Sequence, residues 1–203
     1  MGLRINFQSY RLHILVCLVG FFSASSSLAL SGVEVQAGMS KQAWESNLGK
    51  GFSNLYEKGI RFWWEPFVRS RVSIGFAGDH ISSQKSSADS AVLVGSEEGY
   101  LLSASISYAK RFFSPRFMIG TCFSKVMDGN IVQKSYRQDF LWTVSGEKLS
   151  VVATWFWNPA IYTGSGFYLT RRTLTADFQP ESDGVSSWDL ASQGLSWSLG
   201  YRF

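Results

Sequence analysis

The chain is short of the features that would point to a helical membrane protein or a metalloenzyme. Although 45% of its 203 residues are hydrophobic, no apolar run beyond residue 29 reaches the roughly 20 residues that a spanning helix needs. Only two cysteines and two histidines occur, and Cys17 and His13 lie within the first 29 residues. The single cysteine and single histidine that remain cannot supply the ligand set of a zinc site. We therefore expect no metal and no cofactor.

An excess of one charge is also missing. Of the 19 basic residues, Arg4 and Arg11 belong to the N-terminal segment, which leaves 17 basic against 15 acidic residues. This balance gives no basic surface for a nucleic acid, so we expect no nucleic-acid partner. A phosphate-binding loop, a dinucleotide fingerprint and the GxSxG motif of many hydrolases are absent from the sequence as well.

Residues 1–29 have the three parts of a signal peptide. Arg4 and Arg11 give a positive start, residues 14–22 an apolar stretch too short to span a bilayer, and Ser27, Leu28 and Ala29 a small-x-small cleavage site. We predict cleavage after Ala29, with cleavage after Ala37 as the alternative. The mature chain is then expected to be exported through the periplasm.

The final strand carries the most specific pattern. Apolar side chains alternate there with small or polar ones, and in a β-strand they would share one face, since successive side chains point to opposite faces. The apolar, outward residues are Leu195, Trp197, Leu199, Tyr201 and Phe203. The chain also stops at an aromatic residue. This combination resembles the last strand of bacterial outer-membrane β-barrels, the small eight-stranded type with a C-terminal Phe. The resemblance implies a place in the cell outer membrane, contact with its lipid and lipopolysaccharide, and recognition of this strand by the barrel-assembly machinery.

Similar alternation recurs upstream with no helix between the strands, which excludes a parallel α/β fold. We predict an all-β fold: an eight-stranded antiparallel transmembrane β-barrel over residues 68–203. For the eighth strand we choose residues 89–95 over residues 59–67, because this choice leaves short turns at 96–99, 127–130 and 158–160 in the periplasm and the long stretch 177–187 outside. The other seven strands are expected at 72–77, 102–109, 117–124, 140–144, 149–157, 162–170 and 195–203.

The N-terminal segment, residues 30–67, is predicted to hold an amphipathic helix. Over residues 39–58 apolar residues recur at three- and four-residue spacing, and Ser40 can cap the start. We expect this helix to lie in the membrane interface or against the barrel rim. Aromatic side chains expected at the membrane interface are Trp44, Trp63, Trp64, Trp155, Trp157 and Phe203.

The inward face of the predicted barrel is dominated by serine and glycine. The charged inward candidates are Arg137, Asp139 and Arg202, and Tyr168 would help to fill the lumen. We favour a plug of paired charges that stabilises the barrel, since eight strands leave an interior that side chains fill. A narrow pore, or a slot for an acyl chain, is the alternative.

A single group of residues could carry chemistry. His80 is the one near-neutral base of the mature chain, Asp79 could orient its ring, and Ser82 could act as the nucleophile. The His-x-Ser order resembles that of lipid A deacylase barrels, where a glutamate completes the site; Glu97 and Glu98 are the distant candidates here. Lipid A palmitoyltransferase barrels also combine a loop histidine with Asp and Ser.

Because short motifs of this kind recur by chance, we favour a non-enzymatic structural or interaction role. In that role the outer loops of the barrel, residues 80–87 and 177–187, would contact lipopolysaccharide or partners. The alternative is a lipid A-modifying outer-membrane enzyme, an acyltransferase or a deacylase, that uses His80.

Overall fold

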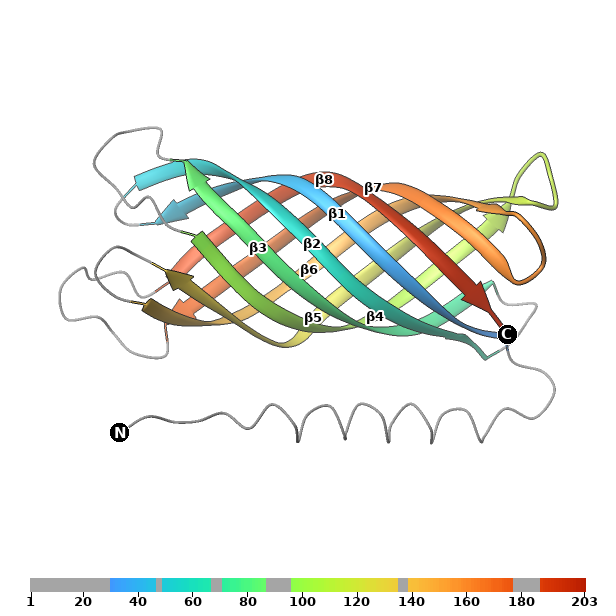
Figure 1. Ribbon diagram of the computed structural model, residues 1–203, viewed down its shortest axis with the longest axis horizontal. Coiled ribbons are helices and arrows are strands. Elements are labelled where there is room, and N and C mark those ends of the chain that lie inside the picture. Colours follow the sequence, from blue (N-terminus) through green and yellow to red (C-terminus); the bar gives the residue numbers. More distant parts are fainter. Residues whose placement is uncertain (1–29, 47–48, 67–70, 87–95, 135–138, 177–186) are drawn as a thin grey trace.

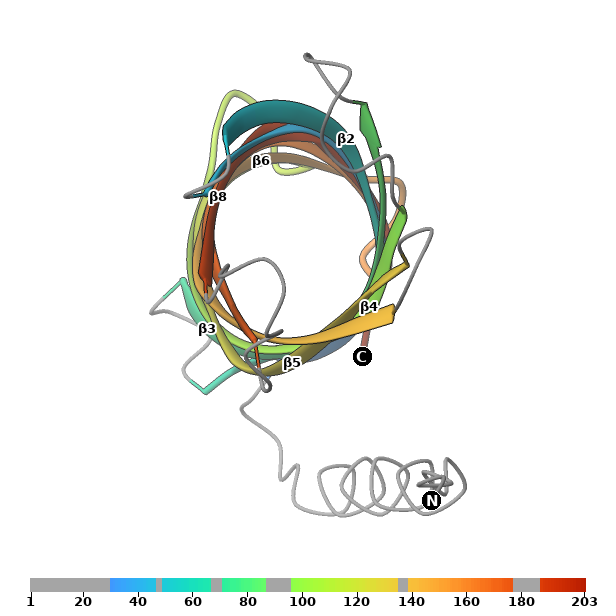
Figure 2. The ribbon, with the colours of Figure 1, turned by 90° about the vertical axis from the view of Figure 1, so that its left-hand side faces the viewer.

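The computed structural model describes residues 30–46, 49–66, 71–86, 96–134, 139–176 and 187–203. They form eight strands, each antiparallel to its neighbours, and β1 pairs with β8 to close a barrel (Figures 1 and 2). The predicted eight-stranded antiparallel barrel is thereby confirmed. The strands are β1 (Leu30–Ser46), β2 (Gly49–Glu65), β3 (Val72–Ser86), β4 (Ser96–Arg111), β5 (Phe117–Lys134), β6 (Asp139–Phe156), β7 (Ile161–Ala176) and β8 (Ser187–Arg202).

The start of β1 and the end of β8 meet at one end of the barrel (right in Figure 1). There Ser31 and Phe203 exchange two backbone hydrogen bonds of 3.2 and 2.9 Å. The predicted turn at residues 158–160 lies at this end, where the Asn158 carboxamide oxygen accepts bonds from the backbone N–H groups of Ala160 and Ile161. Since short turns of such barrels face the periplasm, we assign this end to the periplasm and the opposite end to the cell exterior.

The prediction of an amphipathic helix over residues 39–58 is wrong, because this stretch contains the end of β1 and the first part of β2. The error has a physical cause. In β2 the outward face carries Phe52 and Tyr56, and the inward face carries Leu55, which is 1% exposed. Apolar residues on both faces of a strand reproduce the three- and four-residue spacing of a helix. No helix long and apolar enough to cross a bilayer occurs among the described residues.

The barrel therefore begins at Leu30 rather than at residue 68, and the expected strands are regrouped. Residues 140–144 and 149–157 belong to one strand, β6, which runs through Gly146 instead of turning there. Residues 96–99 begin β4, and residues 127–130 lie within β5 beside a β-bulge, so neither is a turn. The rejected candidate for the missing strand, residues 59–67, contributes to β2 as far as Glu65. The chosen one, residues 89–95, lies outside the described residues.

Large apolar side chains cover the outer surface of the barrel in a belt. On each strand they occupy alternate positions, the arrangement that a bilayer imposes on a spanning barrel. Towards the outer end the belt gives way to exposed Lys41, Lys58, Lys125, Glu147 and Arg171. Exposed members of the belt include Val35, Met39, Ile60, Ile74, Phe76, Leu102, Ile106, Ile119, Phe123, Leu149, Val151, Phe167, Leu169, Leu195, Trp197 and Leu199.

Most of the aromatic residues predicted at the membrane interface do face outward. Trp64, Trp155, Trp157 and Phe203 are exposed near the periplasmic end. Trp63 is an exception and its assignment is wrong: it alternates with Trp64, so its ring points into the lumen, where Nε1 donates a hydrogen bond of 2.8 Å to the Tyr162 hydroxyl. The side chain of Trp44 lies outside the described residues.

The first strand bears on the site of leader cleavage, although residues 1–29 lie outside the described part. Ala37 is in the middle of β1, where it pairs with Lys58 of β2 and Trp197 of β8. We predict that the mature protein begins at Leu30, because cleavage after Ala37 would remove half of the strand that closes the barrel. N-terminal sequencing of the membrane-inserted protein checks this. A mature chain that begins at Gly38 would contradict the prediction.

Candidate functional site

The middle of the lumen is crossed by an ion cluster. The Lys148 ammonium on β6 lies 2.6 Å from one carboxylate oxygen of Glu57 on β2, and the Arg172 guanidinium on β7 donates to the other oxygen. Strands β2 and β6 stand four places apart in a ring of eight, so the bridge joins opposite walls. Glu57 is 4% exposed. The Lys148 ammonium also lies 4.2 Å from the centre of the Tyr168 ring, a favourable cation–π contact.

An apolar cluster fills the lumen between this ion cluster and the outer end. Side chains from seven strands, β2 to β8, meet there, and among them the Trp142 and Trp188 rings have centroids 6.0 Å apart. Together the two layers close the described part of the lumen to the exterior. The cluster consists of Leu55, Ile81, Leu101, Ile131, Trp142, Val144, Leu174, Trp188 and Leu190.

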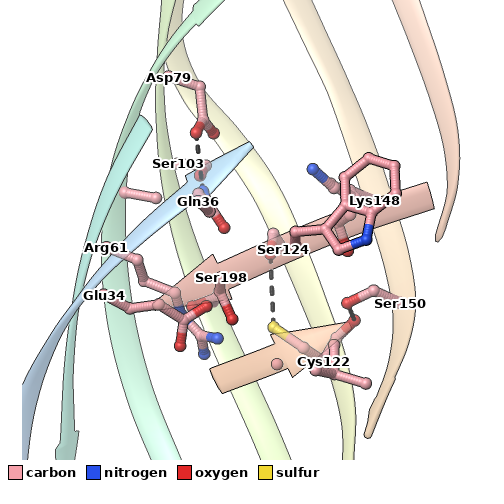
Figure 3. A pocket seen from close by; sticks show the side chains of 16 residues that line it. Glu34, Gln36, Arg61, Asp79, Ser103, Cys122, Ser124, Lys148, Ser150 and Ser198 are labelled. Carbon is pink, nitrogen blue, oxygen red and sulfur yellow. Dashed lines mark hydrogen bonds between the residues drawn. The ribbon is translucent and has the colours of Figure 1, made fainter. Parts of the chain in front are cut away.

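Small inward side chains leave a polar cavity of about 50 Å³ in the periplasmic half (Figure 3). The Gln36 amide donates a 2.7 Å hydrogen bond to Asp79 across it. Since one water needs at least 10–15 Å³ of such volume, the cavity suits a few waters and is too small for an acyl chain. Its small lining residues include Ser103, Ser105, Ser124, Ser150, Ser196 and Ser198.

The predicted lumen residues are placed unevenly. Tyr168 is fully buried, and Arg202 faces inward with its guanidinium carbon 5.1 Å from the centre of the Phe156 ring. The prediction that Asp139 faces the lumen is wrong, because this residue is exposed at an outward position of β6. Arg137 lies outside the described residues. The cluster of Glu57, Lys148 and Arg172 was not predicted from the sequence, because Glu57 lies in the stretch that was predicted to be a helix. If this stretch is taken as a strand, alternation places Glu57 on the same inward face as Leu55.

Among the described residues, a constellation with catalytic residue types lies on the lipid-facing surface, where β3 and β4 adjoin. His80 Nε2 is 3.0 Å from the Glu98 carboxylate, and the His80 ring meets the edge of Tyr100 with centroids 5.1 Å apart. The Lys134 ammonium lies 3.7 Å from the other Glu98 oxygen. The His80 side chain is 33% exposed and that of Glu98 is 53% exposed, so a substrate can reach both.

The structure separates Asp79 from His80 and leaves Ser82 on the same face as His80. Asp79 points into the lumen, because neighbouring residues of a strand face opposite ways, and it cannot orient His80. Ser82 stands two residues beyond His80 on the same outward face and is paired in register with Glu98. Both residues lie within β3, so the loop expected to begin at residue 80 is a strand as far as Ser86.

This arrangement has the three residue types of a serine hydrolase on one surface. With the His80 Nε2 proton donated to Glu98, Nδ1 is left as the proton acceptor, the form that a general base requires. The group also stands where the belt on these strands changes from aliphatic and Phe side chains to a mixture of charged, polar and aromatic ones, such as exposed Tyr56 and Tyr100. Below it on these strands the outward side chains include Ile60, Phe76 and Leu102, whereas Lys58 and His80 form the next paired row.

Comparison with known proteins gives likeness in structure only. No family model matches the chain, and no curated protein matches its sequence. The structure is similar to Neisserial surface protein A (NspA), with a TM-score of 0.53 and 14% identity over 82% of this chain and 95% of that chain. It is similar to the outer membrane protein OprG from Pseudomonas aeruginosa, with a TM-score of 0.52 and 9% identity over 87% of this chain and 96% of that chain.

At such identities the likeness concerns the fold. The resemblance to small bacterial outer-membrane barrels that the final strand predicted is confirmed at that level. A closed barrel is one of the two structures that can span a bilayer. Together with the apolar belt, this fold indicates the outer membrane as the location of the chain.

The ion cluster generates a stability prediction. Replacing Glu57→Gln removes the only carboxylate that contacts both Lys148 and Arg172 among the described residues. The buried Arg172 and the half-buried Lys148 then lose the counter-charge that contacts them. We expect a loss of about 3 kcal/mol or more in the free energy of unfolding. Urea unfolding in detergent, followed by gel migration without boiling, measures it. The control Glu147→Gln, at an exposed outward position, should change little; equal effects of both variants would contradict the account.

Proposed function

We propose that this chain is an outer-membrane barrel that hydrolyses acyl esters of outer-leaflet lipids at its lipid-facing surface. The observation that carries the proposal is the contact between His80 and Glu98 on the face that also presents Ser82. It makes the enzymatic alternative from the sequence more specific, because Glu98 takes the orienting role first given to Asp79.

Each side chain has a defined role. Ser82 Oγ attacks the ester carbonyl while His80 Nδ1 takes the hydroxyl proton. The Glu98 carboxylate holds the ring and stabilises the imidazolium that forms, as the carboxylate of a catalytic triad does. The proton then passes to the departing alcohol, and water, activated by the same ring, releases the fatty acid from Ser82.

The height of His80, Ser82 and Glu98 along the barrel axis supports a lipid substrate. The acyl esters of a bilayer lie where the hydrocarbon meets the headgroups, and aromatic side chains of a barrel gather at that level. His80 stands in a row with Tyr100 and Lys58, where the outward side chains become a mixture of aromatic and charged ones. Lys58, beside His80 in register, suits a lipid phosphate. The His-x-Ser order with a glutamate partner is similar to that of lipid A deacylase barrels, so an ester of lipid A is the first substrate to test.

An acyltransferase is less well supported, because the cavity of about 50 Å³ offers no slot for a donor chain. A second function is favoured by the closed lumen: a non-enzymatic, non-conducting barrel whose exposed basic residues, such as Lys41 and Arg171, contact lipopolysaccharide. In either case the final strand is the proposed contact with the barrel-assembly machinery.

Lipid A from cells with and without the protein, analysed by mass spectrometry, tests the hydrolase. We expect loss of one acyl chain with the wild type. Ser82→Ala and His80→Ala should lower the rate by about 1,000-fold, and Glu98→Gln by about 100-fold. Ser145→Ala, at an exposed position of β6, is the matched control and should retain full activity. Intact lipid A with the wild type, or an active Ser82→Ala variant, would leave the non-enzymatic function.

A further inference from the structure

Gly78 is an unusual glycine in this barrel. The other glycines with described surroundings face the lumen, while Gly78 is exposed on the outer face. Outward positions in the belt normally carry bulky apolar side chains, because these side chains contact the hydrocarbon of the lipids. Gly78 therefore leaves a gap in the belt, two residues from His80 on the same face.

The barrel itself does not require a glycine at this position. A Cβ atom added at Gly78 would meet only the Leu102 side chain, at an ordinary contact distance of 3.7 Å. At the inward glycines an added Cβ would be much more crowded; at Gly59, for example, it would come within 2.6 Å of a backbone oxygen. The backbone at Gly78 also has no positive φ. The missing side chain thus serves neither backbone geometry nor internal packing.

The neighbours of Gly78 form the walls of the gap. In register it pairs with Ile60 of β2 on one side and Leu102 of β4 on the other. These side chains are 48% and 45% exposed. His80 follows towards the exterior and Phe76, 55% exposed, follows towards the periplasm. Because same-face residues of a strand are about 7 Å apart, the gap lies directly beneath the His80 ring.

We propose that the acyl chain of the ester cleaved at Ser82 lies over Gly78, between the side chains of Ile60 and Leu102. This inference rests on the proposed hydrolase function and makes Gly78 a residue that selects long acyl chains. The occupant follows from the location: the gap opens into the hydrocarbon layer, and a chain that enters it brings its ester carbonyl to the level of His80. An acetyl group is too short to reach Gly78 from there.

The test compares two esters with the purified protein in detergent, p-nitrophenyl acetate and p-nitrophenyl decanoate. Gly78→Leu fills the gap and should lower kcat/KM for the decanoate by about tenfold or more, the effect expected when apolar contacts in a binding site are lost. Hydrolysis of the acetate should stay unchanged. Gly78→Ala, whose Cβ has room, should give a smaller shift in the same direction.

Ala153→Leu on β6 is the matched control, because it adds the same side chain to the belt away from His80. It should leave the ratio of the two kcat/KM values unchanged. Gel migration without boiling verifies that each variant is folded. An unchanged ratio in Gly78→Leu, or an equal shift in Ala153→Leu, overturns the Gly78 inference alone. If the folded wild type hydrolyses neither ester, the proposed hydrolase function fails and the inference fails with it.

Discussion

Closure of the sheet is the constraint on which the rest of the structure depends. Inside a bilayer no water is available for backbone N–H and C=O groups, so each strand must pair on both sides. The β1–β8 pairing provides the last of these ladders, and the bonds between Ser31 and Phe203 extend it to the end of the chain. Once the ring is closed, alternation fixes which side chains meet lipid and which meet the lumen.

That division directs attention to the outer surface. The lumen is occupied by the ion cluster of Glu57, Lys148 and Arg172 and by the apolar cluster towards the exterior. The remaining cavity suits a few waters. Among the described residues, a larger molecule can meet the barrel at its lipid-facing surface, where His80, Ser82 and Glu98 share one face. Because the described lumen is filled, the proposed site lies on the lipid-facing wall of the barrel.

The sequence predicts the barrel well where the two faces of a strand differ in character. The final strand is the clearest case, with Trp197 and Tyr201 outside and Ser196 and Gly200 inside. The prediction fails in β2, where inward Leu55 lies among outward Phe52 and Tyr56. It also fails at Gly146, which resembles a turn residue but continues β6.

Asp79 could have been excluded from the candidate site by alternation alone, since it adjoins His80. The match of Glu98 to His80 could not be predicted, because the register of β3 and β4 across residues 87–95 is not encoded in local spacing.

The most direct test of the account is covalent capture of the nucleophile. The folded protein in detergent would be treated with an alkyl fluorophosphonate, which reacts with activated serines, and the adduct would be located by peptide mass spectrometry. We predict a single adduct on Ser82 in the wild type and none in His80→Ala. The absence of an adduct in the folded wild type, or labelling of Ser82 that is as fast without His80, would contradict the claim that these residues form a hydrolase site.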